Sequence, residues 1–311
     1  MKQIKVGFIG AGGIAKSHAF AIRALSFFYD NVPDITLSSV TSATKESRTL
    51  FAKNFKFRSS PSPEEFFTNK NIDAVFILGP NSVHFEHFQM ALKMPGVKYI
   101  YLEKPVCASL EEEIKMRELL AEAGGRIKIQ VGFQYLQTSS VREALKLWRS
   151  GIMGKPLHFD LKYYHGDYLK ADYRAKRQSR LTPAPDGGAM ADLGSHGISL
   201  LVAFLGEQLK ITGAIQSGCF DDVPAGSDLF SSISVTDPET KAAGHLSASR
   251  ISSGSGDLVS MEIYAKNGWL SYSSKDPGFF EYYLEESGQH IKRYAGSDYS
   301  PASAFPSRHA S

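Results

Sequence analysis

The glycine-rich segment near the start of the chain constrains the fold more than any other feature. Residues 6–9 are a short apolar run typical of a buried parallel strand, and Gly10-Ala11-Gly12-Gly13-Ile14-Ala15 follows directly, fitting G-x-G-x-x-G/A. Gly10 permits a tight turn, Gly12 leaves room for a pyrophosphate, and an amphipathic helix begins there with N–H groups that attract an anion. The segment therefore predicts a dinucleotide site that includes Gly10, Gly12, Gly13 and Ile14.

Strand and helix patterns alternate through the first part of the chain. The strand patterns are at residues 35–41, 72–78, 97–102 and 127–133, and the helical patterns are at residues 45–55, 82–94 and 110–123. This alternation is typical of a doubly wound parallel sheet, in which functional groups gather at the carboxyl ends of the strands. We therefore expect the glycine segment, Ser42, Pro80, Asn81 and Lys104 along one edge of the sheet.

The segment after the second predicted strand bears on the choice of nucleotide. In NAD-binding folds a carboxylate about 20 residues after the glycines accepts hydrogen bonds from the ribose 2′-hydroxyl. Ser42 stands at this place, and Thr44, Lys45 and Arg48 follow. Hydroxyls and cations suit a 2′-phosphate, so the segment favours NADP over NAD. The alternative is a solvated helix start whose Lys and Arg contact no ligand.

The pattern changes after residue 132, which predicts two domains, residues 1–132 and 133–311. A helix is expected at residues 141–150 and a long polar stretch at residues 166–186. Strand patterns then dominate, at residues 157–164, 211–216, 231–236, 243–250, 258–265 and 269–273. The predicted class is α/β, with a parallel Rossmann sheet followed by an α+β domain whose large open sheet is mainly antiparallel.

The composition indicates which partners and which cell compartment the protein has. The chain is 42% hydrophobic and 22% charged, with a net charge of +3 and no block of like charges, so nothing points to nucleic acid or an anionic membrane. No segment reaches the ~20 apolar residues of a membrane span. Cys107 and Cys219 form no C-x-x-C pair, which argues against structural zinc and disulfides. We expect a cytoplasmic protein without a metal site.

Asp192 and His196 are spaced for one face of a helix, because residues four apart lie above one another. A carboxylate beside an imidazole fixes its tautomer and raises its basicity, as proton transfer requires. An exposed pair or a core histidine would give the same pattern. Arg174 and Arg180 in the polar stretch have two interpretations as well, a grip on an acidic substrate or a solvated loop.

Taken together, these motifs resemble the glucose–fructose oxidoreductase / inositol dehydrogenase (Gfo/Idh/MocA) family over nearly the whole chain. Their order and spacing both agree with the family. The matching segments are Gly10 to Ala15 with His18, Ile72 to Val75, Pro80-Asn81 with His84, Glu103-Lys104-Pro105, Gly132-Phe133, Gly151 to Pro156, and Gly187-Gly188 through Asp192, Gly194 and His196.

The resemblance implies oxidation of a secondary alcohol of a sugar, cyclitol or related polyol by NAD or NADP, or the reverse reaction. It carries three catalytic residues over to this chain. His196 would act as general base, Lys104 would hold the hydroxyl and stabilise developing charge, and Asp192 would orient His196 or hold a neighbouring hydroxyl. It also implies a homodimer or homotetramer formed through the C-terminal sheet. With the glycine segment, the cofactor-binding residues would be Ser42, Lys45, Pro80, Asn81, His84 and Glu103.

Two other functions fit the same motifs. One is a glycosidase that uses tightly bound NAD for transient oxidation, and the other is a non-catalytic dinucleotide-binding sensor. Lys104, Asp192 and His196 together disfavour the sensor, which needs no proton relay. The chain departs from the family at Ser42, Asp186 and Ser199, and residues 294–311 lack helical periodicity, so we expect the family's C-terminal helix to be absent.

Overall fold

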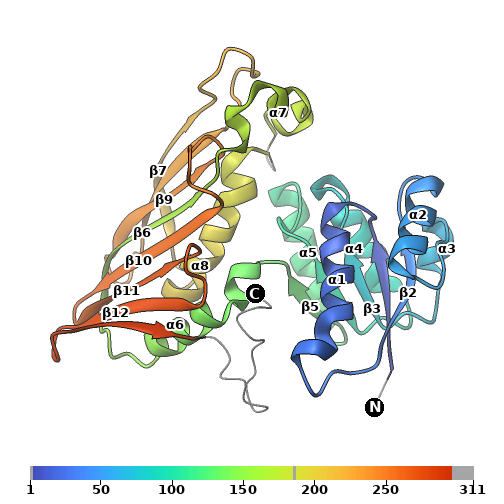
Figure 1. Cartoon of the computed structure of the whole chain (residues 1–311), viewed down its shortest axis with the longest axis horizontal. Helices are drawn as coiled ribbons and strands as arrows, with labels where there is room; N and C mark the ends of the chain where they lie inside the picture. The colour runs from blue at the N-terminus through green and yellow to red at the C-terminus, as the bar shows by residue number, and fades with distance from the viewer. Residues whose placement is uncertain (1–2, 185–186, 296–311) are drawn as a thin grey trace. The chain divides into compact units, whose positions relative to one another are not determined.

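The protein contains two sheets, each with its own core (Figure 1). The structure is a computed structural model that describes residues 3–184 and 187–295, and the chain divides into two compact units between Gly132 and Phe133. The α/β class and both sheet types predicted from the sequence are confirmed. The predicted loss of a C-terminal helix concerns residues that lie almost entirely outside the described ranges.

The first unit contains five parallel strands in the order β2-β1-β3-β4-β5. The strands are β1 (Ile4–Ile9), β2 (Ile35–Thr41), β3 (Ala74–Ile77), β4 (Tyr99–Leu102) and β5 (Lys128–Val131). The helices are α1 (Gly13–Phe28), α2 (Lys45–Phe55), α3 (Pro63–Phe67), α4 (His84–Lys93) and α5 (Leu110–Glu122). The strand order reverses between β1 and β3, and ligands of open α/β sheets bind beyond the carboxyl ends of the strands at such a point.

Side-chain caps mark where two helices of this unit, α2 and α3, begin. Thr44 accepts a hydrogen bond from the backbone N–H of the third residue after it, and this starts α2 at the predicted Lys45. Ser62 and Glu65 form a capping box around the short helix α3, which the sequence analysis did not predict. Five residues are too few for a periodic pattern, so α3 was visible in the sequence through its cap alone.

The second unit contains eight strands in the order β13-β12-β11-β10-β6-β9-β8-β7. All neighbouring strands are antiparallel except β6 and β9. The strands are β6 (Pro156–Tyr164), β7 (Lys210–Ser217), β8 (Phe230–Thr236), β9 (Ala243–Ser249), β10 (Leu258–Ala265), β11 (Gly268–Ser273), β12 (Phe279–Leu284) and β13 (Gln289–Tyr294). Strands β12 and β13 were not predicted, because their sequences, FFEYYL and QHIKRY, do not alternate between apolar and polar residues.

Helices α6 (Ser139–Arg149) and α8 (Ser195–Leu205) lie against this sheet (Figure 1). A π-helical turn, Met190–Gly194, leads directly into α8, so the helix expected around Asp192 is wider at its start than an α-helix. The predicted polar stretch at residues 166–186 contains short helical segments, including α7 (Ala171–Ala175). No helix within residues 3–184 and 187–295 is long and apolar enough to cross a membrane.

Candidate active site

The glycine loop after β1 has the geometry that a dinucleotide requires. Gly10 has φ +120°, and a Cβ there would lie 2.7 Å from the carbonyl oxygen of Leu78, so the position accepts glycine alone without strain. Gly12 precedes the first turn of α1, and no side chain caps that helix. A Cβ at Gly12 or Gly13 would meet nothing within 4 Å. The start of α1 therefore has room for an anion such as a pyrophosphate.

The loop after β3 carries Pro80 and Asn81, which lie at the same edge of the sheet as the glycine loop. His84 follows them at the start of α4 but is fully buried. Its Nδ1 lies 2.8 Å from the Pro105 carbonyl oxygen and its Nε2 lies 3.0 Å from that of Gly79. The His84 ring therefore ties two backbone loops together, and its contact with a cofactor stays a prediction.

The Glu103 carboxylate is also engaged by the protein itself. It lies 2.8 Å from Nε2 of His18 and accepts hydrogen bonds from the Tyr101 hydroxyl at 3.3 Å and the Lys104 backbone N–H at 3.1 Å. Burial acts to raise the pKa of Glu103, but these partners outweigh it and hold that pKa below its ordinary value. Glu103 thus fixes the loop from which the Lys104 side chain extends, at the end of β4.

The segment after β2 folds as a compact helix start. The Ser42 hydroxyl donates to the Thr44 carbonyl at 3.2 Å, and Nη1 of Arg48 donates to the Ser42 carbonyl at 3.2 Å. Lys45 is exposed at the first position of α2. Nε of Arg48 is buried and has no hydrogen-bond partner among the described residues. A hydroxyl, an exposed ammonium and a guanidinium are thus grouped at the place where NAD-binding folds carry a carboxylate.

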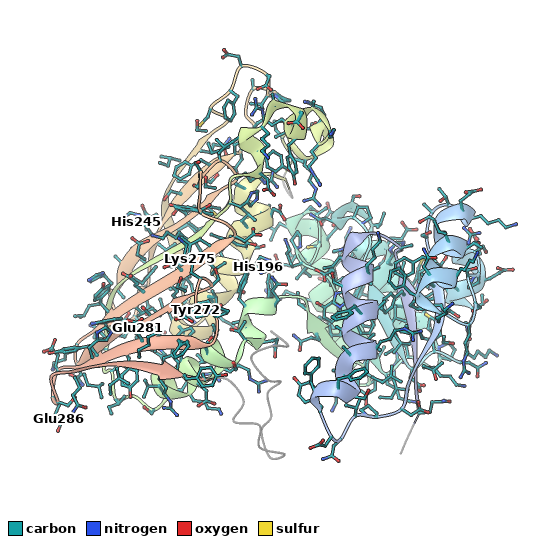
Figure 2. The ribbon with its side chains drawn as sticks, in the orientation of Figure 1. His196, His245, Tyr272, Lys275, Glu281 and Glu286 are labelled. Atoms are coloured by element: carbon teal, nitrogen blue, oxygen red, sulfur yellow. The ribbon has the colours of Figure 1, made fainter. Side chains whose placement is uncertain are left out.

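His196 lies in the second unit, at the start of α8, with 4% of its surface exposed (Figure 2). The rings of Tyr135, Tyr163 and Phe133 surround it at centroid distances of 5.2, 5.7 and 6.0 Å. Burial, reinforced by the neighbouring Tyr135 hydroxyl, raises the pKa of Tyr163. The imidazole is thus held among aromatic rings that exclude water, where proton transfer is controlled by the groups that reach it.

Asp192 has a partner that the sequence analysis missed. Its Oδ2 accepts a hydrogen bond from Nη2 of Arg250 at 2.9 Å and a longer one from Nη1 of Arg180 at 3.5 Å. Arg250 lies 58 residues further along the chain, directly after β9. No local pattern links the two positions, which come together because the π-helical turn packs against β9.

Arg174 has neither of the two roles considered for it. Its guanidinium pairs with Asp222, with Nη2 2.9 Å from Oδ2, and Nη1 donates to the carbonyls of Tyr168 and Leu169 at 2.8 and 2.9 Å. The side chain is 7% exposed. Arg174 therefore fastens the polar stretch to the rest of the second unit, and its donors face protein groups.

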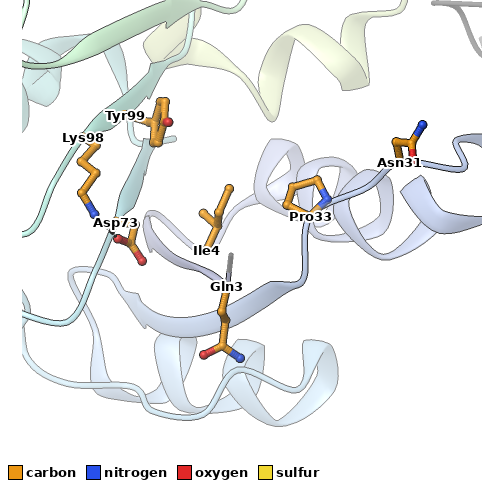
Figure 3. A pocket seen from close by; sticks show the side chains of 7 residues that line it. All are labelled: Gln3, Ile4, Asn31, Pro33, Asp73, Lys98 and Tyr99. Atoms are coloured by element: carbon orange, nitrogen blue, oxygen red, sulfur yellow. Dashed lines mark hydrogen bonds and ion pairs between the residues drawn. The ribbon is translucent and has the colours of Figure 1, made fainter. Parts of the chain in front are cut away.

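A hollow of about 350 Å³ lies at the opposite edge of the parallel sheet, where β1 and β4 begin (Figure 3). Asp73 at its wall accepts hydrogen bonds from the Lys98 ammonium at 2.7 Å and the Lys5 backbone N–H at 3.0 Å. It shares no residue with the predicted site, and we assign it no function. Its lining residues are Gln3, Ile4, Asn31, Pro33, Asp73, Lys98 and Tyr99.

This fold and this loop define a class, the oxidoreductases with an NAD-binding Rossmann domain. Residues 4–133 match the model of the Gfo/Idh/MocA oxidoreductase family with its NAD-binding Rossmann fold, and residues 141–271 match the family's C-terminal domain. The chain belongs to the Gfo/Idh/MocA family, as its motifs indicated.

The chain is similar to several characterised proteins. It is 26% identical to levoglucosan dehydrogenase of Pseudarthrobacter phenanthrenivorans, covering 88% of this chain and 74% of that protein. It is 27% identical to glucose-6-phosphate 3-dehydrogenase of Bacillus subtilis, covering 68% of this chain and 57% of that protein. A solved structure of levoglucosan dehydrogenase with NADH matches with a TM-score of 0.88 at 22% identity, covering 99% of this chain and 84% of the other, which shows the shared fold.

Proposed function

We propose that the protein transfers a hydride between a nicotinamide nucleotide and a secondary alcohol or ketone of a sugar, cyclitol or related polyol. The observation that carries the proposal is the glycine loop, where Gly10 turns the chain sharply and the first turn of α1 is left open. The dehydrogenase relatives, which act on levoglucosan and glucose 6-phosphate by name, support the substrate class.

In this proposal the first unit holds the nucleotide. Gly10, Gly12, Gly13 and Ile14 would hold the pyrophosphate, and Pro80 and Asn81, in the loop after the neighbouring strand β3, would border it. A nicotinamide nucleotide held there would supply the hydride acceptor for oxidation and the hydride donor for reduction. His84 and Glu103 contribute by fixing the loops after β3 and β4, consistent with their buried contacts.

The proton is handled by side chains of the protein. When an alcohol is oxidised, its carbon loses a hydride and its oxygen loses a proton, so a base must take that proton as the C=O bond forms. We assign the base to the imidazole of His196 and the stabilisation of the oxygen to Nζ of Lys104. Asp192 is the carboxylate that orients His196 or binds a neighbouring hydroxyl of the substrate.

We propose further that the protein prefers NADP(H). The support is local, since Ser42 replaces the carboxylate that binds a ribose 2′-hydroxyl, while Lys45 and Arg48 supply positive charge beside it. Fluorescence titration with NADPH and with NADH tests this directly. Tighter binding of NADPH is expected, and tighter binding of NADH would contradict it.

We also propose a cytoplasmic homo-oligomer, a dimer or a tetramer, formed through the face of the eight-stranded sheet that carries Tyr264 and Trp269. Tyr264 stacks on His158 at 4.3 Å, and Trp269 lies 5.3 Å from the ring of His290, so aromatic side chains line this face. Aromatic residues are enriched in interfaces. Light scattering on the purified protein measures the assembly, and a monomer at micromolar concentration would contradict it.

The proposed activity is tested by following reduction of NAD+ and NADP+ by the purified protein. The substrates are levoglucosan, glucose 6-phosphate and myo-inositol, each also offered to a Lys104→Met variant. Reduction of the nucleotide by at least one substrate, and its loss in the variant, is the expected result. A native protein that binds the nucleotide tightly but reduces it with none of them would contradict the proposal and direct attention to glycosides.

A further inference from the structure

Arg250 carries a buried positive charge beside Asp192. Its side chain is 3% exposed, and its guanidinium carbon lies 5.0 Å from the centre of the Tyr168 ring. Its backbone N–H donates to the Leu229 carbonyl at 2.8 Å, and Nη1 donates to the Arg180 carbonyl at 3.1 Å. The Tyr168 ring and the Arg180 carbonyl therefore hold the side chain, and Nη2 is left to bond Asp192 at 2.9 Å.

A buried ion pair of this kind is not required for packing. Taking a guanidinium out of water costs several kcal/mol, and apolar residues of similar volume often stabilise a core as well or better. His165, which lies close enough to affect the same charges, adds no second cation, because burial lowers its pKa and it is neutral near pH 7. The charge of Arg250 thus acts on Asp192 in particular.

Asp192 needs such a partner because packing does not fix its side chain. It is 25% exposed and lies in the π-helical turn before α8, where the regular spacing of an α-helix does not determine its direction. A charge-assisted hydrogen bond from an immobile guanidinium fixes one carboxylate oxygen. Arg180 bonds the same oxygen more weakly, and its side chain is 58% exposed.

We propose that Arg250 is a positioning residue for the reaction, which holds the Asp192 carboxylate in the orientation that its proposed part in the proton transfer requires. The inference rests on the proposed function, because it assigns Arg250 a part in the same proton transfer. Arg250 itself acts through Asp192 and contacts no reacting atom. Displacement of a supporting group by about 1 Å can lower a rate about 100-fold.

The test compares Arg250→Met, Arg250→Lys and the matched control Arg180→Met, using the substrate of the panel above that the native protein oxidises fastest. Arg250→Met is expected to lower kcat about 100-fold with an unchanged Kd for the reduced nucleotide. Arg250→Lys keeps the charge and is expected to lose less. Arg180→Met removes an exposed partner of the same oxygen and is expected to lower kcat less than about threefold. A further variant, Arg250→Ala, separates a positioning role from a merely structural one. Guanidinium chloride at millimolar concentration is expected to restore its turnover, whereas the loss of a merely structural residue would not be rescued.

A second readout does not depend on turnover. Asp192→Asn leaves the buried Arg250 charge without a carboxylate to neutralise it, whereas Arg250→Met leaves a carboxylate that is partly in water. The inference therefore expects a larger fall in Tm for Asp192→Asn than for Arg250→Met. The reverse order would overturn it.

The activity measurements distinguish a failure of the proposed function from a failure of the inference about Arg250. A native protein that oxidises none of the substrates overturns the proposed function, and the inference with it. A native protein that turns over while folded Arg250→Met keeps the native kcat overturns the inference alone. Equal losses in Arg250→Met and Arg180→Met would also overturn it, since burial would then confer no advantage.

Discussion

The glycine loop of the first unit and the start of α8 in the second unit, where we propose the nucleotide site and the proton-transfer residues, are built by different means. The loop is formed by backbone groups, with Gly10 at φ +120° and an open first turn of α1. The start of α8 is instead formed by side-chain contacts, in which Arg250 bonds Asp192 and aromatic rings surround His196. A site formed by backbone groups requires positions without a side chain. A site formed by side chains requires residues of other elements to contact it.

The largest effect is expected from a substitution of Gly10, which would disrupt the backbone of the glycine loop. A Cβ there lies 2.7 Å from the Leu78 carbonyl at a φ that branched residues avoid, so Gly10→Val should cost about 3 kcal/mol or more in the free energy of unfolding. Chemical denaturation measures this. Gly12→Ala is the matched control, since its Cβ meets nothing, and it should keep native stability while weakening nucleotide binding. A stable Gly10→Val variant that still binds NADH would show that the loop geometry is not required.

The next effect separates the two buried arginines of the second unit. Arg174→Met removes the partner of Asp222 and the donor to two backbone carbonyls, and should lower the free energy of unfolding by about 2 kcal/mol. Turnover by the folded variant should be unchanged, in contrast to Arg250→Met. The control is Arg177→Met, an exposed arginine of the same stretch, which should change stability by less than about 0.5 kcal/mol. Lost turnover in a folded Arg174→Met would erase the distinction.

A smaller effect, on acid stability, is expected at the loop after β4 in the first unit. The pKa of Glu103 is lowered in the folded state from 4.5, so its contribution is complete above about pH 4.5 and is lost as the pH falls through the folded pKa. Glu103→Gln should therefore lower the free energy of unfolding at neutral pH by about 1 kcal/mol, which lowers Tm there. It should also flatten the decline of Tm below about pH 4.5. Thermal denaturation across this range measures both. An identical acid decline in the variant would mean that Glu103 is not the group responsible.

The smallest effect concerns nucleotide choice. Arg48→Gln removes a positive charge beside Ser42, and should lower the ratio of NADPH to NADH affinity about threefold while leaving NADH affinity nearly unchanged. Lys53→Gln, at the other end of α2, provides the control. If the ratio moved equally in both variants, net charge rather than a phosphate site would explain the preference.

The same contrast explains what the sequence predicted. The glycine loop is continuous in sequence, and strand, turn and helix each leave a local pattern, so the parallel sheet and the boundaries of α2 followed from residues close together. His84 and Glu103 were placed correctly along the chain, but their burial depends on carbonyls and rings of other segments. Arg250 had no signal, because its link to Asp192 spans 58 residues and exists only where the π-helical turn packs against β9.

The measurement that tests the account most directly is made on His196→Ala, with Kd for the reduced nucleotide and kcat for the best substrate determined on the same folded sample. If the first unit binds the nucleotide and His196 of the second unit moves the proton, kcat falls at least about 100-fold while Kd stays within about twofold. A variant that keeps its turnover would remove His196 from the mechanism, and one that loses nucleotide binding would contradict the division of labour between the two units.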